Sequence, residues 1–213
     1  MAIFDICLSK TRCNDIPSET TRRGQENEIA SNVCSVKKSQ VQEFVELVGK
    51  KGHSFCPSTF INVYRRKDTF KQTQLFALFF NNSSNDNKKH SNSFSFDDIA
   101  QRARQYNLPI FFAYDVFSSF LWESNHQLFC IVFLNEIPIF NLQEAEAIQK
   151  ALLTIFPEAD RKHGGVIDLY FGGNSILYYD ETMPTINPDV VFMNMCLYLK
   201  NRYGATNYKR KVV

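Results

Sequence analysis

Two groups of basic residues in this sequence could contact phosphates. The larger group lies near the C-terminus, close to Tyr203 and Tyr208, and consists of Lys200, Arg202, Lys209, Arg210 and Lys211. The smaller group is Arg65, Arg66 and Lys67. Cationic side chains neutralise nucleic-acid phosphates and aromatic rings stack on bases, so both groups are candidate nucleic-acid contacts. The charged end of a C-terminal helix explains the larger group equally well, and both interpretations stay open.

Composition places few limits on function. The chain of 213 residues fits one domain, and its 44% hydrophobic and 22% charged residues are near globular averages. A formal net charge of +2 does not require a polyanionic partner. The 20 phenylalanines indicate a wide aromatic core.

Cysteine and histidine spacing argues against a metal centre. The six cysteines never form a CxxC pair and the four histidines are scattered singly, which favours reduced thiols in an intracellular protein over disulfides or zinc. No apolar run approaches the ~18 residues of a membrane span, and the N-terminus lacks the pattern of a signal peptide. The sequence therefore predicts a cytoplasmic protein without membrane contact.

The order of apolar patterns predicts strands interleaved with helices. Residues 1–39 are polar and mixed, and they predict a poorly ordered or accessory arm before a main domain over 40–211. Helical spacing or caps predict helices at 41–48, 96–106, 141–156 and 189–203. Apolar runs predict strands at 75–80, 110–117, 128–134, 168–171 and 176–179, the last two flanking a turn at Gly172 and Gly173. The expected fold is α+β, with an α/β-type mixed sheet flanked by helices.

Several sequence segments, in order, resemble the archaeo-eukaryotic primase (primase-polymerase) domain of replication and primase-helicase proteins from Firmicutes mobile elements. The segments are 52–60 (GHSFCPSTF), 66–78 (RKDTFKQTQLFAL), 108–114 (LPIFFAY), 117–119 (FSS), 131–134 (IVFL), 155–160 (IFPEAD), 170–173 (YFGG), 180–187 (DETMPTIN) and 201–211 (NRYGATNYKRK). The resemblance implies an RRM-related core and template-directed joining of nucleotides with a divalent metal, often beside a helicase.

The residues that should hold that metal differ from the family pattern. The resemblance places an Asp-x-Asp pair at the end of the 75–80 strand, where this chain has Phe79 and Asn81. A phenyl ring cannot coordinate a hard cation, and an amide brings no negative charge to it. We therefore expect no metal and no catalytic residue here, with Mg²⁺ or Mn²⁺ relevant only if residual activity exists.

Two further positions also depart from the family. A Lys-Phe-Arg pattern is replaced by Leu128, Phe129 and Cys130, and Asp168 stands where a phosphate-binding Arg is expected. Residual site candidates are Asp168, Ser118, Ser119 and His126; a strand-end carboxylate and a surface histidine are the simpler explanations for Asp168 and His126. Gly172 and Gly173 could permit a positive φ or a close approach of phosphate or backbone.

The combined expectation is a catalytically degenerate primase-polymerase-like domain in mobile-element DNA replication, which is not an enzyme. It would bind single-stranded DNA, a primer-template, or a replication protein or helicase. One alternative is an active primase or polymerase, which needs Asp168, Asp115 or Glu123 to converge near Asn81. Another alternative is a protein-interaction regulator of an active homologue, and a decayed gene remnant would have the same sequence features.

Overall fold

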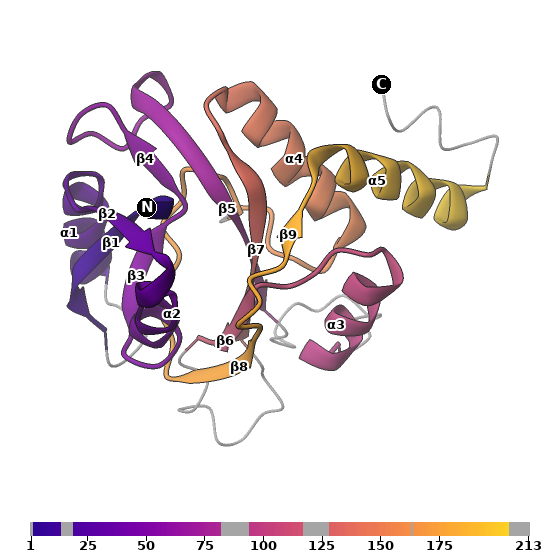
Figure 1. The fold of residues 1–213 in the computed structure, drawn as a ribbon, viewed down its shortest axis with the longest axis horizontal. Coiled ribbons are helices and arrows are strands. Elements are labelled where there is room, and N and C mark those ends of the chain that lie inside the picture. The colour runs from indigo at the N-terminus through magenta and orange to yellow at the C-terminus, as the bar shows by residue number, and fades with distance from the viewer. Residues whose placement is uncertain (1, 14–18, 82–93, 117–127, 163, 205–213) are drawn as a thin grey trace.

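The computed structural model describes residues 2–13, 19–81, 94–116, 128–162 and 164–204 (Figure 1). Five α-helices in these ranges are α1 (Glu19–Glu28), α2 (Val41–Gly49), α3 (Phe96–Gln105), α4 (Leu142–Ile155) and α5 (Pro188–Tyr203). The strands are β1 (Ala2–Arg12), β2 (Val33–Lys37), β3 (His53–Cys56), β4 (Ser58–Phe60), β5 (Phe70–Asn81), β6 (Phe112–Asp115), β7 (Leu128–Ile139), β8 (Ser175–Tyr179) and β9 (Thr185–Ile186).

A large, mainly antiparallel sheet forms the centre of the molecule. Its strands follow the order β4-β5-β7-β6-β8, and the short β9 pairs in parallel with β7. A second sheet of three strands has the order β2-β1-β3. Figure 1 shows α3, α4 and α5 on one side of the large sheet, and the small sheet with α2 on the other. The predicted α+β class is confirmed.

Alternation along the central strands gives the large sheet two buried faces. On β5, Phe76, Leu78 and Phe80 contribute to the core beneath α3 and α4, whereas Leu75 and Ala77 contribute to the core beneath α2. Successive side chains of a strand point to opposite faces, so a strand covered on both sides is apolar throughout. This explains the uninterrupted LFALFF run in the sequence.

The four predicted helices form, and three of them, α3, α4 and α5, start at a side-chain cap. The Ser95 hydroxyl accepts a hydrogen bond from the Asp98 amide at 3.2 Å, and the Asp98 carboxylate accepts one from the Ser95 amide at 2.8 Å. Asn141 caps α4, and Asn187 caps α5 immediately before Pro188. Each cap satisfies amide groups that have no partner inside the helix.

Of the expected poorly ordered or accessory arm over 1–39, poor order is wrong for the residues described there, which include β1, α1 and β2. β1 pairs with β2 on one side and with β3 on the other, and Phe4 and Ile6 are buried in the core beneath α2. Pairing on both sides satisfies the β1 backbone, and burial of the apolar side chains stabilises the strand. The position of a domain boundary near residue 40 stays a prediction.

The strand predicted at 168–171, before the turn at Gly172 and Gly173, is also wrong. β8 pairs with β6, while residues 168–171 form no strand and contribute only an isolated bridge between Tyr170 and Phe55. The turn-like Gly172-Gly173 sequence therefore connects two different parts of the fold instead of two paired strands.

Candidate functional site

The end of β5, where the family resemblance places metal ligands, lies against the core beneath α2. Phe79 is opposite Cys130 and Asn81 is opposite Leu128 in the β5–β7 ladder. Phe79 packs partly buried against that core, and its carbonyl accepts a hydrogen bond from the Asp160 amide at 2.8 Å. Asn81 is exposed at the strand end. A phenyl ring at position 79 is thus accommodated by packing.

Neutral, buried side chains fill the space beside Phe79. The Tyr114 hydroxyl donates to the Phe171 carbonyl at 2.9 Å, and the Tyr170 hydroxyl donates to the Ala77 carbonyl at 2.8 Å. Burial raises the pKa of both tyrosines well above its ordinary value. Burial also raises the pKa of the Cys130 thiol to about 12. These groups stay protonated at neutral pH and offer no anionic ligand.

The described residues therefore do not fit Mg²⁺ or Mn²⁺ at this position. Divalent magnesium and manganese prefer several oxygen ligands, usually including carboxylates. Within the described ranges, no group of three or more His, Cys, Asp or Glu side chains could hold a metal ion. Of the acids named as possible replacement ligands near Asn81, which are Asp168, Asp115 and Glu123, Glu123 lies outside the described residues.

Asp168 takes part in a local structural network. Its carboxylate accepts a hydrogen bond from the Gly165 amide at 2.7 Å and lies 4.0 Å from the Arg65 guanidinium. Arg65 also donates to the Ile167 carbonyl at 2.8 Å and lies 3.8 Å from Glu26. Asp168 thus closes the turn over 165–168, and Arg65 holds that turn against β4. The sequence predicts that Arg65 contacts phosphate, but its guanidinium points inward to these partners.

The two glycines at 172 and 173 are required by close backbone packing. A Cβ atom on Gly173 would overlap the Asp115 carbonyl oxygen, and one on Gly172 would lie 2.5 Å from the Gly52 carbonyl carbon. The Gly173 amide donates to the Val48 carbonyl at 2.8 Å. The positive-φ glycines in the described chain are Gly52 and Gly204, so close approach is the reason for glycine here.

A basic and aromatic surface lies at the connection between β4 and β5. The Arg66 guanidinium carbon is 5.2 Å from the Tyr64 ring centroid, and both side chains are exposed. Val63 is also exposed beside them, whereas Lys67 is paired with Glu146 at 2.6 Å. We call Val63, Tyr64 and Arg66 the β4–β5 tip. Of the smaller basic group, Arg66 and Lys67 are both exposed, and Lys67 is already paired with a carboxylate.

A second arginine–tyrosine group lies at the end of α5. Arg202 donates to the Tyr198 hydroxyl at 2.6 Å, and its guanidinium carbon is 5.6 Å from the Tyr203 ring centroid. Lys200 is exposed in the same turn. The remaining predicted residues of this group, Lys209, Arg210 and Lys211, lie outside the described residues, as do Ser118, Ser119 and His126.

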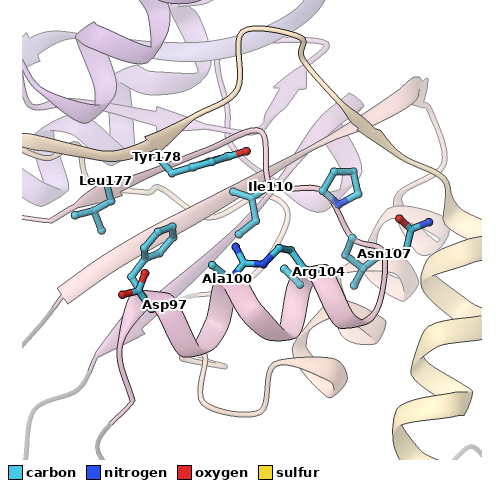
Figure 2. A pocket seen from close by; sticks show the side chains of 11 residues that line it. Asp97, Ala100, Arg104, Asn107, Ile110, Leu177 and Tyr178 are labelled. Atoms are coloured by element: carbon cyan, nitrogen blue, oxygen red, sulfur yellow. The ribbon is translucent and has the colours of Figure 1, made fainter.

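The sequence prediction missed a groove between α3 and β8. The groove has a volume of about 530 Å³ and is lined by α3, by residues 107–110 and by Leu177 and Tyr178 of β8 (Figure 2). Its charged residues, Asp97 and Arg104, are seven positions apart on α3. A helical period of 3.6 residues places such positions on one face, which is the signal that could have identified them.

Comparisons with known proteins return one similar fold. No protein-family model and no curated protein sequence matches the chain. Among solved structures, the chain is similar to the AEP domain of the cyanophage S-2L primase-polymerase (PrimPol), with a TM-score of 0.46 and 8% sequence identity. The alignment covers 76% of this chain and 79% of that domain. In the part of the chain that is described, no helix is both long and apolar enough to span a membrane.

Proposed function

We propose that this chain is a non-catalytic nucleic-acid-binding module of the primase-polymerase type, acting in the cytoplasm in mobile-element DNA replication. The observation that carries the loss of catalysis is the end of β5. Phe79 and Asn81 supply no carboxylate there, and the adjoining Tyr114, Cys130 and Tyr170 are buried and neutral. Nucleotidyl transfer through two metal ions needs carboxylate ligands at that position.

Binding to single-stranded nucleic acid is supported by the β4–β5 tip. Tyr64 is 56% exposed, so its ring is available to stack on a base, and Arg66 beside it can contact the adjoining phosphate. A positive charge held over an aromatic ring is a pairing suited to a stacked base and its phosphate. The group around Arg202 repeats this combination at the end of α5.

The proposal is tested by fluorescence anisotropy with a labelled single-stranded oligonucleotide and a primer-template, at two salt concentrations. The same samples, with Mn²⁺ and all four nucleotides, are then run on a gel to detect extension. We expect salt-sensitive binding without extension. Extension of the primer would show that the chain is an active nucleotidyltransferase and would overturn the proposal.

Variants of the β4–β5 tip locate the contact. Tyr64→Ala should weaken single-strand binding by about five-fold or more, because one stacked base is worth about 1–3 kcal/mol. Arg66→Gln should reduce the slope of log affinity against log salt by about one ion. The matched control is Arg161→Gln, which removes an exposed arginine from another part of the surface. Equal losses in the control and in Arg66→Gln would contradict a site at the tip.

A second candidate function is regulation of an active replication protein through direct contact. The observation that favours it is the outward side of α5, where Met193 is 67% exposed and Leu197 is 47% exposed. Large apolar side chains grouped on one helix often mark protein interfaces. Co-purification with a catalytically active homologue or its helicase after nuclease treatment, lost in Met193→Ser with Leu197→Ser, would support this function over nucleic-acid binding.

A further inference from the structure

The groove between α3 and β8 is built by specific local features. Ala100 and Ala103 present small side chains on the groove side of α3, which leaves space that larger residues would fill. On the opposite wall, the β6–β8 register shifts between Ala113 and Tyr114, so that Leu177 is an extra residue in β8. A bulge of this kind redirects side chains, and here Leu177 and Tyr178 both line the groove (Figure 2).

The end of α3 closes the groove with a rigid turn. The Leu108 amide donates to the Ala103 carbonyl at 2.9 Å and the Asn107 amide donates to the Arg104 carbonyl at 3.1 Å. These two hydrogen bonds form a Schellman motif, in which the residue after the helix has a positive φ, and Asn107 has a φ of 49°. Leu108 is buried, so the turn that positions Asn107 beside the groove is anchored in the core.

Two exposed side chains of opposite charge, Asp97 and Arg104, border the groove. Within the described part of the chain, neither the Asp97 carboxylate nor the Arg104 guanidinium makes an ion pair or a side-chain hydrogen bond. Seven residues of α-helix separate their Cα atoms by about 10 Å along the axis. Between them the groove has two apolar walls, formed by Ala100 on α3 and by Leu177 on β8, and Tyr178 also lines it (Figure 2).

We propose that this groove binds a single nucleotide unit whose base carries an exocyclic amino group. The phosphate binds Arg104, the amino group donates to the Asp97 carboxylate, and the flat base lies between Ala100 and Leu177. Guanidinium groups bind phosphate through paired hydrogen bonds, and carboxylates accept from the amino group of cytosine. The volume of the groove is within the range of about 300–1,000 Å³ that small-molecule sites occupy.

The proposed site does not depend on nucleic-acid binding at the β4–β5 tip. Its ligand chemistry, a base joined to one phosphate, could come from a free nucleotide or from a nucleotide within a strand. Competition distinguishes these sources, because a single-stranded oligonucleotide displaces a bound mononucleotide only if a strand can enter the groove. This competition is run in the Tyr64→Ala variant, so that contacts at the tip do not contribute.

The first test is isothermal titration of the whole chain with deoxycytidine monophosphate, deoxyuridine monophosphate and deoxycytidine. The two monophosphates differ in the amino group, and deoxycytidine lacks the phosphate. We expect saturable binding of deoxycytidine monophosphate, at least about ten-fold weaker binding of deoxycytidine, and several-fold weaker binding of deoxyuridine monophosphate. Absence of saturable binding at millimolar nucleotide, or equal affinity for all three compounds, would overturn the proposal.

Variants assign the two ends of the ligand. Arg104→Gln should weaken binding of deoxycytidine monophosphate about ten-fold, whereas the control Arg161→Gln should leave it unchanged. Asp97→Asn should reduce the preference for the cytosine over the uracil nucleotide. Ala100→Leu should abolish binding by filling the groove, with unchanged thermal unfolding showing that the fold is intact. Binding that survives both Arg104→Gln and Ala100→Leu would place the ligand elsewhere and refute the site.

Discussion

The end of β5 and the groove between α3 and β8 differ in the burial and hydrogen bonding of their polar side chains. At the end of β5, Tyr114 and Tyr170 are buried and hydrogen-bonded to backbone carbonyls, and Phe79 packs where the family resemblance implies a metal ligand. In the groove, Asp97 and Arg104 are exposed and Tyr178 is 40% exposed. A packed region tolerates few polar changes, whereas an open one with exposed charges is available to a ligand. Phe79 belongs to the core beneath α2, whereas Ala100 and Leu177 belong to the core on the other face of the large sheet, so the proposed nucleotide site and the position where the resemblance implies a metal are on opposite faces.

The largest expected effect is at the packed connection before β8. Gly173→Ala should destabilise the protein by about 3 kcal/mol or more, because the new methyl group overlaps the Asp115 carbonyl oxygen. That oxygen belongs to the backbone and cannot move away without disturbing the strand. Gly24→Ala in α1 is the control: a methyl group added there meets no atom within 4 Å, and alanine should stabilise the helix by up to about 1 kcal/mol. Urea unfolding measures both, and similar effects at the two glycines would contradict the packing described.

A carboxylate introduced at the end of β5 should destabilise the protein at position 79 and have little effect at position 81. Phe79→Asp should cost about 2–3 kcal/mol, because it removes a packed ring and places a charge beside buried neutral groups. Asn81→Asp, at an exposed position, should change stability by less than about 0.5 kcal/mol. Chemical denaturation measures the free energy of unfolding of both variants. A stable Phe79→Asp protein that extends a primer with Mn²⁺ would show that a metal site can form at this position.

Removing the hydroxyl of one tyrosine in each region compares the two regions by the same chemical change. Tyr170→Phe should cost about 1–1.5 kcal/mol, because the buried hydroxyl donates to Ala77; Gln149 still donates to that carbonyl, which limits the loss. Tyr178→Phe should cost less than about 0.5 kcal/mol, since the Tyr178 side chain is exposed and its hydroxyl donates to the partly exposed Asp180 carboxylate at 3.3 Å. Thermal unfolding of the two variants measures both losses of stability. A larger loss in Tyr178→Phe than in Tyr170→Phe would mean that the groove is the more tightly packed region.

The smallest expected effect is a pH dependence at the start of α3, beside the groove. Hydrogen bonds from the Ser95 amide and hydroxyl lower the pKa of the Asp98 carboxyl below its ordinary value. A carboxyl with a lowered pKa in the folded state contributes stability above its unfolded pKa of about 3.9, and that contribution is lost as pH falls further. Melting temperatures below pH 4 should therefore fall slightly less steeply in Ser95→Ala, and identical slopes would exclude the effect.

The sequence by itself determined the features whose partners are nearby in the chain. Ser95, Asn141 and Asn187 each cap a helix by accepting hydrogen bonds from amides two or three residues away. The local sequence therefore determines where α3, α4 and α5 start. The lack of carboxylates at Phe79 and Asn81 is likewise a property of the sequence, although its effect on activity stays a prediction.

Only the tertiary structure decided the features whose partners are distant. Arg65 turns inward because its acceptor, the Ile167 carbonyl, lies about a hundred residues further along the chain, and β1 is ordered because it pairs with both β2 and β3. The groove needs the bulge in β8 to be opposite α3. Local patterns carry no information on such pairings, because the free energy that fixes them comes from contacts formed when the whole chain folds.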